Sequence, residues 1–302
     1  MGVVKDIWRV GVLKAPPQAL LTPAQAAGAQ VVWLPQEGSL RFIADPFPLR
    51  RDGGLHLFVE AYDYRDRRGR IDVIGLDSDL RPSRRQVALQ EPWHLSYPFV
   101  FEAEGEVWML PEAHQSGALT LYRAQAFPLD WRPVARIALD AVAIDATPVF
   151  HEGLWWLFYT PATTRSAKVG ELHCAFAERL TGPWRPHPGN PLRLDAGSAR
   201  PGGVPFVHEG RLVLPVQDCR RTYGGAIRPL VITTLSPDRF EAQAGDPIAP
   251  PAAFAPQTEG LHTWSGLGDL TFIDAKRRVV TPRSLWLDAR REAGKLRRRL
   301  GR

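Results

Sequence analysis

The chain repeats one pattern of hydrophobic and polar positions four times. In each copy an apolar strand starts around a proline, a glycine turn follows, and a polar side chain stands seven residues beyond the glycine. The copies are Asp45-Pro46-Phe47 with Gly53 and Glu60, Tyr97-Pro98-Phe99 with Gly105 and Glu112, Thr147-Pro148-Val149 with Gly153 and Thr160, and Val204-Pro205-Phe206 with Gly210 and Gln217. Their prolines are 52, 50 and 57 residues apart. Two short strands recurring at this period predict a β-propeller.

Other segments add the outer strands and a fifth, weaker unit. Outer strands are expected at 70–75, 119–124, 171–177 and 228–234. The fifth unit begins near His262, continues through 269–273, turns around 274–276 and resumes at 278–281. Strands at 7–13 and near 31–34 place residues 1–41 in the last blade, which they would complete. The prediction is one all-β domain over 1–282, a five-bladed β-propeller, followed by a short basic amphipathic helix over 283–302.

A propeller collects equivalent residues around one axis, so polar side chains in matching register are expected to share one cleft. A carboxylate facing this crowded axis needs a partner or a ligand. The residues expected there are Asp45, Asp145, Glu60, Glu112, Arg200, Gln217 and Asp218.

Composition limits the partners. The net charge of +6 lies wholly in 283–302, where seven Arg and one Lys face one Asp and one Glu. The body is therefore neutral, and no nucleic-acid partner is expected. Two unpaired-looking cysteines, an N-terminus without an apolar core and the lack of roughly 20 consecutive apolar residues favour a cytoplasmic protein, in solution or peripheral at the inner face of the membrane.

The tail carries a narrow apolar stripe flanked by basic residues, formed by Leu285, Ala289, Ala293, Leu296 and Leu300. Such a helix either rests on an anionic membrane or is a solvated terminal helix. Both interpretations stay open.

Several strings resemble one known family. They are Ile43-Ala44-Asp45-Pro46-Phe47, His94-Leu95-Ser96-Tyr97-Pro98-Phe99, Met109-Leu110-Pro111-Glu112, Phe127-Pro128-Leu129-Asp130-Trp131, Gly182-Pro183-Trp184 with His187-Pro188 and Asn190-Pro191, Ala199-Arg200-Pro201-Gly202-Gly203, and Gln217-Asp218-Cys219 with Tyr223-Gly224. Over nearly 6–240 the chain resembles the N-terminal domain of plant glucosamine inositolphosphorylceramide transferases and its free-standing bacterial relatives. That family looks like a five-bladed propeller similar to glycoside hydrolase families 43 and 32.

The resemblance to these hydrolases implies roles for single residues. Asp45 matches the general base, and Asp145 matches the auxiliary aspartate. The fourth blade departs from the pattern, because Arg200 stands where a general-acid Glu is expected, with Gln217 and Asp218 on the adjoining strand.

The departure decides between mechanisms. Hydrolysis of a sugar–sugar bond needs a neutral carboxylic acid for its leaving group, and a guanidinium cannot supply that proton. A phosphate leaving group needs no proton and suits a guanidinium fork. Glycosyl transfer from a phosphate-activated sugar to a glycan or glycolipid acceptor is therefore the first hypothesis. An inverting glycosidase with Glu112 or Glu60 as acid, and a non-catalytic glycan-binding platform for a partner glycosyltransferase, remain alternatives.

The other candidates would bind substrate. Ser96 with Tyr97, and Arg200 with Tyr223, are expected to bind hydroxyls or phosphate. His94, His114 and His262 would bind sugar hydroxyls. Trp264 is the expected aromatic platform for a sugar. The histidines lack metal-binding spacing and no nucleotide fingerprint is present, so neither a metal nor a cofactor is expected.

Overall fold

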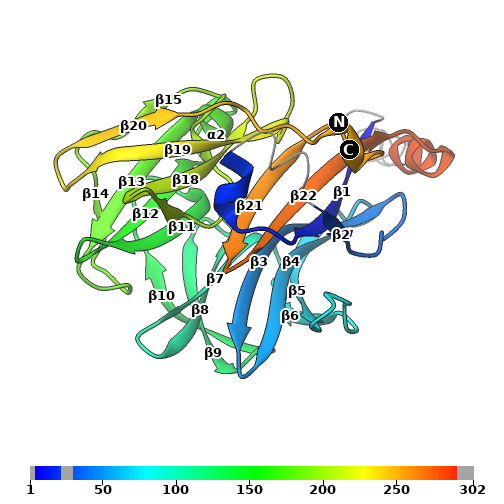
Figure 1. Ribbon diagram of the computed structural model, residues 1–302, viewed down its shortest axis with the longest axis horizontal. Coiled ribbons are helices and arrows are strands. Elements are labelled where there is room, and N and C mark those ends of the chain that lie inside the picture. Colours follow the sequence, from blue (N-terminus) through cyan, green and yellow to red (C-terminus); the bar gives the residue numbers. More distant parts are fainter. Residues whose placement is uncertain (1–3, 22–29, 291–302) are drawn as a thin grey trace, which may run out of the picture.

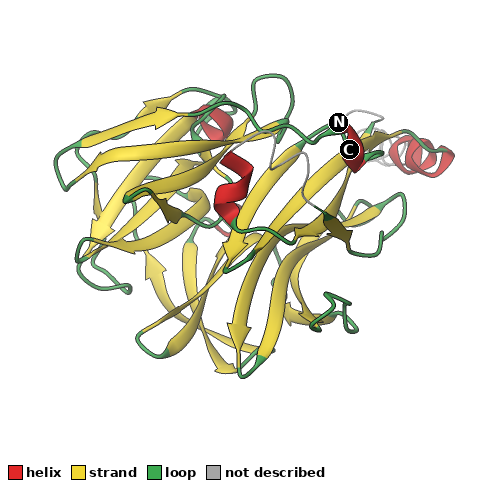
Figure 2. Ribbon diagram, in the orientation of Figure 1, coloured by secondary structure: helices red, strands yellow, loops and turns green. Residues whose placement is uncertain are grey.

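The protein is a five-bladed β-propeller in the computed structural model, which describes residues 4–21 and 30–290 (Figure 1). Five antiparallel sheets surround one axis, and strands greatly outnumber the short helices (Figure 2). This confirms the fold class expected from the fifty-residue repeat. Among the described residues no helix is long and apolar enough to cross a membrane.

Each blade runs from an inner strand at the axis to an outer edge. The strands are β3 (Arg41–Arg51), β4 (Gly54–Asp63), β5 (Arg68–Leu76) and β6 (Gln86–Leu89) in blade 1; β7 (Ser96–Ala103), β8 (Glu106–Glu112), β9 (Leu119–Ala126) and β10 (Asp130–Ile137) in blade 2; β11 (Ala143–His151), β12 (Leu154–Pro161), β13 (Glu171–Ala177), β14 (Arg185–Pro186) and β15 (Arg193–Leu194) in blade 3; β16 (Arg200–Pro201), β17 (Phe206–His208), β18 (Arg211–Asp218), β19 (Ala226–Leu235) and β20 (Phe240–Ala244) in blade 4. The helices are η1 (Pro17–Leu21), η2 (His114–Ser116), α2 (Ala167–Gly170), η3 (Ala252–Phe254) and a C-terminal helix whose described part is 282–290.

The fifth blade joins the two ends of the described chain. It contains β21 (Leu261–Leu267), β22 (Leu270–Val279), β1 (Lys5–Leu13) and β2 (Val31–Trp33), with β1 antiparallel to β22 from Lys5↔Val279 to Leu13↔Thr271. A strand from the beginning of the sequence thus closes the ring of blades (Figure 1). The C-terminal helix follows β22 and is held by the buried Lys5, whose Nζ lies 2.6 Å from Asp288 Oδ2.

The predicted turn in this blade is wrong. Residues 274–276 lie inside β22 and are fully buried, and the hairpin turns instead at Gly268, which has φ +57°. A polar Asp-Ala-Lys triplet resembles a turn in sequence, but here its charged groups have partners within the fold. This correction adds a buried carboxylate, Asp274, to the residues near the axis.

The repeated glycines form tight hairpin turns. In the four inner hairpins both central residues have positive φ, as type I′ turns require, and glycine takes the second place. These pairs are Asp52-Gly53, Glu104-Gly105, Glu152-Gly153 and Glu209-Gly210. The turns lie at the end of each hairpin away from the polar strand starts.

The inner strands are bulged where they begin, which aims side chains toward the axis. Asp45, Tyr97 and Asp145 occupy equivalent bulge positions with φ of 51°, 44° and 49°. A bulge re-aims side chains and ends regular pairing. The proline of the third repeat is displaced by two residues. Ala44 and Ile144 are equivalent in the strand pairing, so Pro148 corresponds to Pro48 rather than to Pro46.

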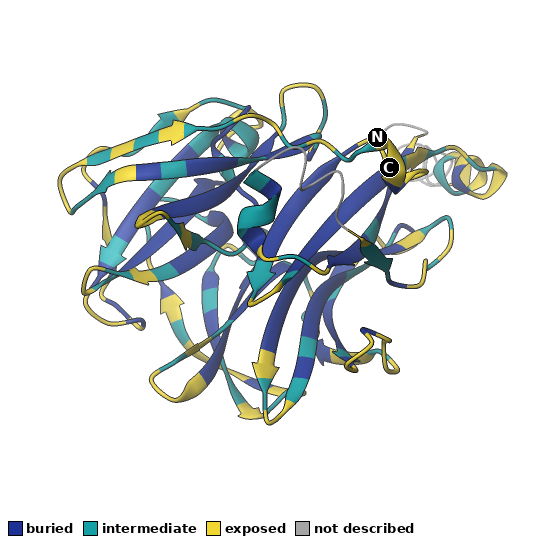
Figure 3. Cartoon of the chain, in the orientation of Figure 1, coloured by how far each residue is buried: buried dark blue, intermediate teal, exposed yellow. Residues whose placement is uncertain are grey.

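Hydrogen bonds at the axis join blades 1, 2, 4 and 5 in a closed ring, and Thr147 attaches blade 3 to it. Asp45 N donates to Asp274 Oδ2 at 2.8 Å, and Tyr97 N donates to Asp45 Oδ2 at 2.9 Å. The Tyr97 hydroxyl then lies 2.9 Å from Thr147 Oγ1 and accepts from Gly203 N at 2.8 Å. Trp264 N donates to Gly202 O and returns the ring to blade 5. The apolar core fills the spaces between neighbouring blades, and exposure is concentrated at turns and outer edges (Figure 3).

Candidate functional site

A cavity of about 500 Å³ opens at the axis, where the inner strands begin. Its walls come from all five blades, as expected for polar residues in matching register. The predicted residues that line it are Asp45, Glu60, Ser96, Glu112, His114, Arg200, Tyr223 and His262. A cavity of this volume is in the range of small-molecule sites.

Asp45 is a buried carboxyl with only 6% of its surface exposed. Oδ2 accepts from Tyr97 N, and Oδ1 accepts from Thr263 Oγ1 at 3.2 Å. Burial raises the pKa of Asp45 to about 6; His262 opposes this shift, while Asp274 and Asp145 add to it. The group therefore changes its protonation state within the range useful for acid and base catalysis.

His262 lies between two carboxylates. Its Nδ1 is 2.6 Å from Asp274 Oδ1, its Nε2 is 3.5 Å from Asp45 Oδ1, and its ring stacks on Trp8 at 3.8 Å between centroids. Burial lowers the pKa of His262, but the charge of Asp274 and its hydrogen bond raise that pKa above the ordinary value. The imidazole is thus held in one orientation beside the Asp45 carboxyl.

Glu60 and Glu112 have opposite environments although they occupy equivalent strand positions. Burial raises the pKa of Glu60 well above its usual value, and the charges of Asp45 and Glu112 add to the shift. Burial alone would raise the pKa of Glu112 too, but hydrogen bonds from His114 lower it below normal. His114 N donates to Glu112 Oε1 at 2.7 Å. Burial therefore favours the neutral form of Glu60, whereas His114 favours the ionised form of Glu112.

Arg200 forms the cationic wall. Its Nε donates to Asp145 Oδ2 at 2.7 Å, and its Nη1 donates to the carbonyl of Lys168 at 2.8 Å. The guanidinium carbon lies 5.0 Å from the centre of the Tyr223 ring. Burial raises the pKa of Asp145, while the Arg200 charge lowers it. A third bond runs from Nη2 to the Tyr223 hydroxyl at 3.3 Å. The three bonds fix the fork in place and leave two of its five N–H groups for a ligand.

Comparison with known families shows which one the chain belongs to. The family described as "Glucosamine inositolphosphorylceramide transferase 1, N-terminal" matches residues 32–278. The chain belongs to this family. It is 36% identical over 239 residues to Glucosamine inositolphosphorylceramide transferase 1 of Oryza sativa subsp. indica, covering 77% of this chain and 31% of that protein. The relative from Arabidopsis thaliana is 35% identical over 230 residues, covering 75% of this chain and 29% of that protein.

The chain therefore spans about a third of the length of these curated relatives. Solved structures share the fold at lower identity. The GH43_1 enzyme from Xanthomonas citri has a TM-score of 0.56 and 15% identity over 87% of this chain and 92% of that one. A family 117 glycoside hydrolase from Zobellia galactanivorans has a TM-score of 0.53 and 13% identity over 79% of this chain and 85% of that one. The expected likeness to hydrolase propellers holds for the fold.

Five of the predicted site residues lie outside the cavity wall: Tyr97, Asp145, Gln217, Asp218 and Trp264. Tyr97 is 1% exposed and belongs to the hydrogen-bonded ring, and Asp145 lies behind Arg200. Gln217 is also 1% exposed and donates to Asp145 Oδ2, so it supports the wall. Asp218 pairs with Arg220 and Arg228.

Trp264 does not form the expected sugar platform. It is fully buried and packs on Phe206, with ring centroids 5.0 Å apart. The cause is a bulge in β21: Leu261 pairs with Ala275 and Thr263 with Asp274, which leaves His262 as the extra residue. One extra residue reverses the faces of a strand, so His262 turns to the cavity and Trp264 to the core.

Several wall residues carry no signal in the repeat. They come from β1, from the turn after β4 and from α2, and they include Asp6, Trp8, Arg67 and Lys168. Behind them Lys276 is fully buried and its Nζ donates to Asp6 Oδ2 at 2.8 Å. The sequence signal for this part of the wall is limited to the charged residues that interrupt the apolar strands β1 and β22.

Within the described ranges, one group of residues has the geometry to hold a metal ion. The ligand atoms of Asp45, His262 and Asp274 lie within 4.8 Å of one another. The Asp274 oxygens already accept from Asp45 N, Thr263 N and His262 Nδ1. These contacts already occupy both oxygens of the Asp274 carboxylate.

Proposed function

We propose that the protein transfers a sugar from a phosphate-activated donor to the hydroxyl group of a glycan or glycolipid. The observation that carries this is a buried carboxyl with a pKa of about 6, Asp45, in the same cavity as the fixed guanidinium of Arg200. A poised base and a phosphate-binding fork are the two groups that such a reaction needs. The name of the plant relatives, glucosamine inositolphosphorylceramide transferase, agrees with this reaction class.

The reaction is a single displacement. Asp45 takes the proton of the acceptor hydroxyl as its oxygen bonds to the anomeric carbon. The bond from that carbon to the phosphate oxygen breaks, and the phosphate leaves with the electron pair. Arg200, with the other cationic wall residues Lys168 and Arg67, balances the charge that develops on the phosphate. His262 steadies ionised Asp45 through the 3.5 Å contact of its Nε2.

The test is turnover with a panel of nucleotide sugars and sugar 1-phosphates in the presence of glycolipid acceptors. Asp45→Asn should bind the donor and lose transfer by at least about a hundredfold, the usual scale of general-base catalysis. Asp52→Asn is the matched control, since Asp52 has a similar φ but lies in an exposed turn. Binding of no phosphorylated sugar, or full activity in Asp45→Asn, contradicts the proposal.

A second function, an inverting glycosidase, is favoured by one observation. Burial raises the pKa of Glu60 well above its usual value and so favours the neutral form that a general acid requires. The lowered pKa of Glu112 makes that residue unsuitable as the acid, so the alternative narrows to Glu60 with Asp45 as base. Release of free sugar from natural glycans that disappears in Glu60→Gln, without any phosphorylated product, would favour hydrolysis over transfer.

A glycan-binding role beside a partner glycosyltransferase is supported by length. The chain matches only 31% of the rice relative, so the named activity of that protein is not assigned to the matching part alone. Here Asp45→Asn should leave glycan affinity unchanged, and turnover should appear only when a partner enzyme is added. Transfer by the purified chain would exclude this role.

We also propose a peripheral contact with an anionic membrane at the cytoplasmic face. The C-terminal helix exposes Leu285 and Trp286. Val4, just before β1, and Val280, just after β22, are also exposed. Arg290 lies over the Trp286 ring at 5.3 Å. An apolar surface with basic neighbours suits the interface of such a membrane. The other stripe residues, Ala293, Leu296 and Leu300, lie outside the described residues.

Sedimentation with vesicles tests this contact. Phosphatidylglycerol vesicles should retain the protein better than phosphatidylcholine vesicles, and Leu285→Ser with Trp286→Ser should release it. Phe150→Ser is the matched control, because Phe150 is 57% exposed next to the hairpin turn of blade 3 and is not part of the C-terminal helix. Equal retention of all three proteins would reject the helix as the contact.

A further inference from the structure

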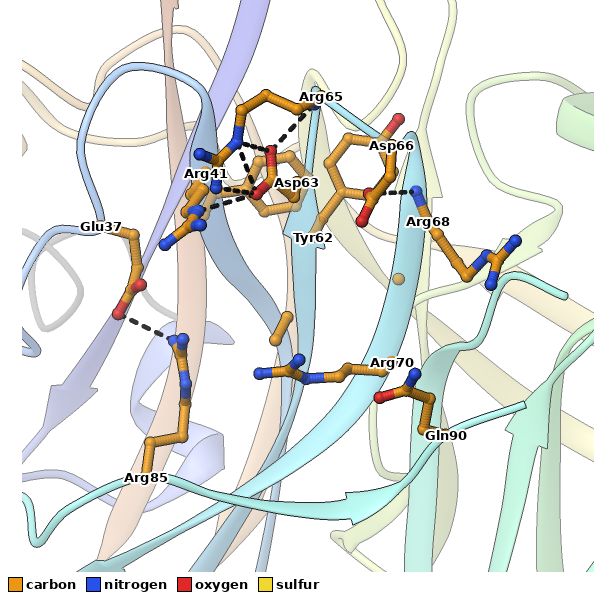
Figure 4. A pocket seen from close by; sticks show the side chains of 13 residues that line it. Glu37, Arg41, Tyr62, Asp63, Arg65, Asp66, Arg68, Arg70, Arg85 and Gln90 are labelled. Carbon is orange, nitrogen blue, oxygen red and sulfur yellow. Dashed lines mark hydrogen bonds and ion pairs between the residues drawn. The ribbon is translucent and has the colours of Figure 1, made fainter. Parts of the chain in front are cut away.

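A second pocket, rich in arginine, adjoins the catalytic cavity on blade 1. It has a volume of about 360 Å³ and lies between β3, β5 and the segment before β6. Five arginines line it against three carboxylates, and a positive charge remains even when the buried Asp72 behind it is counted. Figure 4 shows Arg41 and Arg65 around Asp63 at one end of the pocket, and Arg70 and Arg85 at the other.

Two of the guanidinium groups are held in place from behind. Asp72 is 1% exposed, and its oxygens lie 2.8 Å from the Nε atoms of both Arg70 and Arg85. The buried carboxylate therefore holds Arg70 by Nε and Nη2 and Arg85 by Nε, and leaves the remaining N–H groups of both forks toward the pocket. Arg85 Nη1 is buried without a hydrogen-bond partner of good geometry, although Glu37 lies 2.8 Å from it. Such fixed donors lose little entropy when an anion binds.

Arg68 adds a cation with no carboxylate within 4.0 Å among the residues the structure describes. Its side chain is exposed and lines the pocket, and only its backbone N–H is engaged, with Asp66. Arg41 uses its Nε for Asp63 at 2.7 Å, and its terminal nitrogens are not engaged in a described bond. Donors from several directions suit a tetrahedral anion with three or more oxygens; a carboxylate, with two oxygens, is satisfied by one fork.

We propose that this pocket binds a phosphate group, either a monoester or the diester of a lipid headgroup. The two cavities share a wall, because Phe42 and Tyr62 line both and stack at 5.0 Å between ring centroids. A polyol phosphate lying over this pair would place its phosphate among the arginines and a hydroxyl group toward Asp45. This second placement rests on the proposed transfer function, whereas phosphate binding does not.

Calorimetric titration of the full chain with inorganic phosphate, glycerol 3-phosphate and soluble dioctanoyl phosphatidylglycerol tests the proposal. Changing Arg41 and Arg68 together to Gln should weaken binding roughly tenfold or more, as expected for lost charge-assisted bonds. Arg239→Gln is the matched control, an exposed arginine paired with Glu241 in blade 4. Tighter binding of glycerol 3-phosphate indicates a soluble ester, and tighter binding of the lipid indicates a headgroup.

Two further variants separate this proposal from the proposed function. Asp45→Asn should keep phosphate affinity even where transfer is lost. If Arg200→Gln abolishes binding and the Arg41 and Arg68 changes do not, the phosphate belongs in the catalytic cavity and the proposal is wrong. Absence of binding at millimolar concentration also overturns it. Should the double variant melt early, Arg68→Gln alone carries the test, since it breaks no described ion pair.

Discussion

Replacing Asp45 with Asn should abolish activity and at the same time stabilise the fold. Burial raises the pKa of Asp45 from 3.8 to about 6. The charge of His262 opposes this rise, and the charges of Asp274 and Asp145 add to it. A carboxyl whose pKa is higher in the folded state contributes stability below its unfolded pKa, and that contribution is lost as the pH rises through the folded pKa. The shift of about two units corresponds to ~3 kcal/mol. At pH 8, ionised Asp45 therefore costs the folded protein about this much relative to pH 3.

Asparagine fits this position. Its side chain tolerates the left-handed backbone of residue 45, where φ is 51°. The amide oxygen can accept from Tyr97 N as the carboxylate does, and the amide nitrogen can donate to Thr263 Oγ1, which in turn can donate to Asp274 at 3.1 Å. The substitution thus keeps the contacts and removes the ionisation. We expect at most about 3 kcal/mol of added stability at pH 8, shrinking to none near pH 3.

Urea unfolding at pH 3, 6 and 8 measures this directly, with the slope on denaturant checked for constancy. The melting temperature should rise by roughly 6 °C at pH 8, at about 2 °C per kcal/mol for a chain of this size. Asp52→Asn is the control: it has the same φ of 51° in an exposed turn, so it reports the intrinsic preference for Asn. A variant less stable than the parent at pH 8, or a gain that does not change with pH, refutes the reasoning.

Three other changes should have distinct outcomes. Arg200→Gln leaves the buried Asp145 without its cation and should cost about 3–5 kcal/mol by urea titration at pH 8, less in acid where Asp145 is protonated. Glu60→Gln should hold or raise the melting temperature at pH 8, because burial raises the pKa of Glu60; a clear fall would show that ionised Glu60 supports the fold. Gly203→Ala places Cβ 2.0 Å from Trp264 O, so this variant should melt at a much lower temperature than Gly53→Ala, where nothing lies within 4 Å of the added Cβ. Equal melting temperatures for the two glycine variants would contradict the predicted clash.

The propeller could be predicted because its repeat contains residues that particular backbone conformations require. Each inner hairpin requires glycine at the second place of a type I′ turn, and a polar residue seven positions later stands at the cavity end of the next strand. Glu60 and Glu112 were found in this way. Proline is a poorer marker of the repeat, because Pro148 is equivalent to Pro48 and so lies two residues away from the position of Pro46 in the first repeat.

The fifth blade shows where such reasoning fails. Asp274 lies inside a buried strand, where carboxylates are rare, so the sequence of its triplet predicts a turn instead. The polar neighbours of Trp264 favour a place in the site, but the bulge at His262 reverses the strand faces. Neither feature can be read from alternation alone, because Asp274 is bonded to Asp45 N of blade 1 and the bulge depends on the backbone N–H groups of His262 and Thr263 meeting that same carboxylate. Lys168 and Arg67 come from irregular segments, which the repeat does not reach.

The cavity at the axis and the closure of the fold use the same atoms. Asp45 accepts from blade 2 and donates its backbone N–H to blade 5, so the proposed base is also one link of the ring that joins the inner strands. Only the Asp45 side chain needs to be ionised for catalysis, whereas the ring needs only its hydrogen bonds. This difference is why Asn should preserve the ring and Ala should not: alanine would leave the buried Tyr97 N–H unpaired and keep the strained φ of 51°. The strain at the bulge is thus retained because the same conformation orients the base and connects three blades.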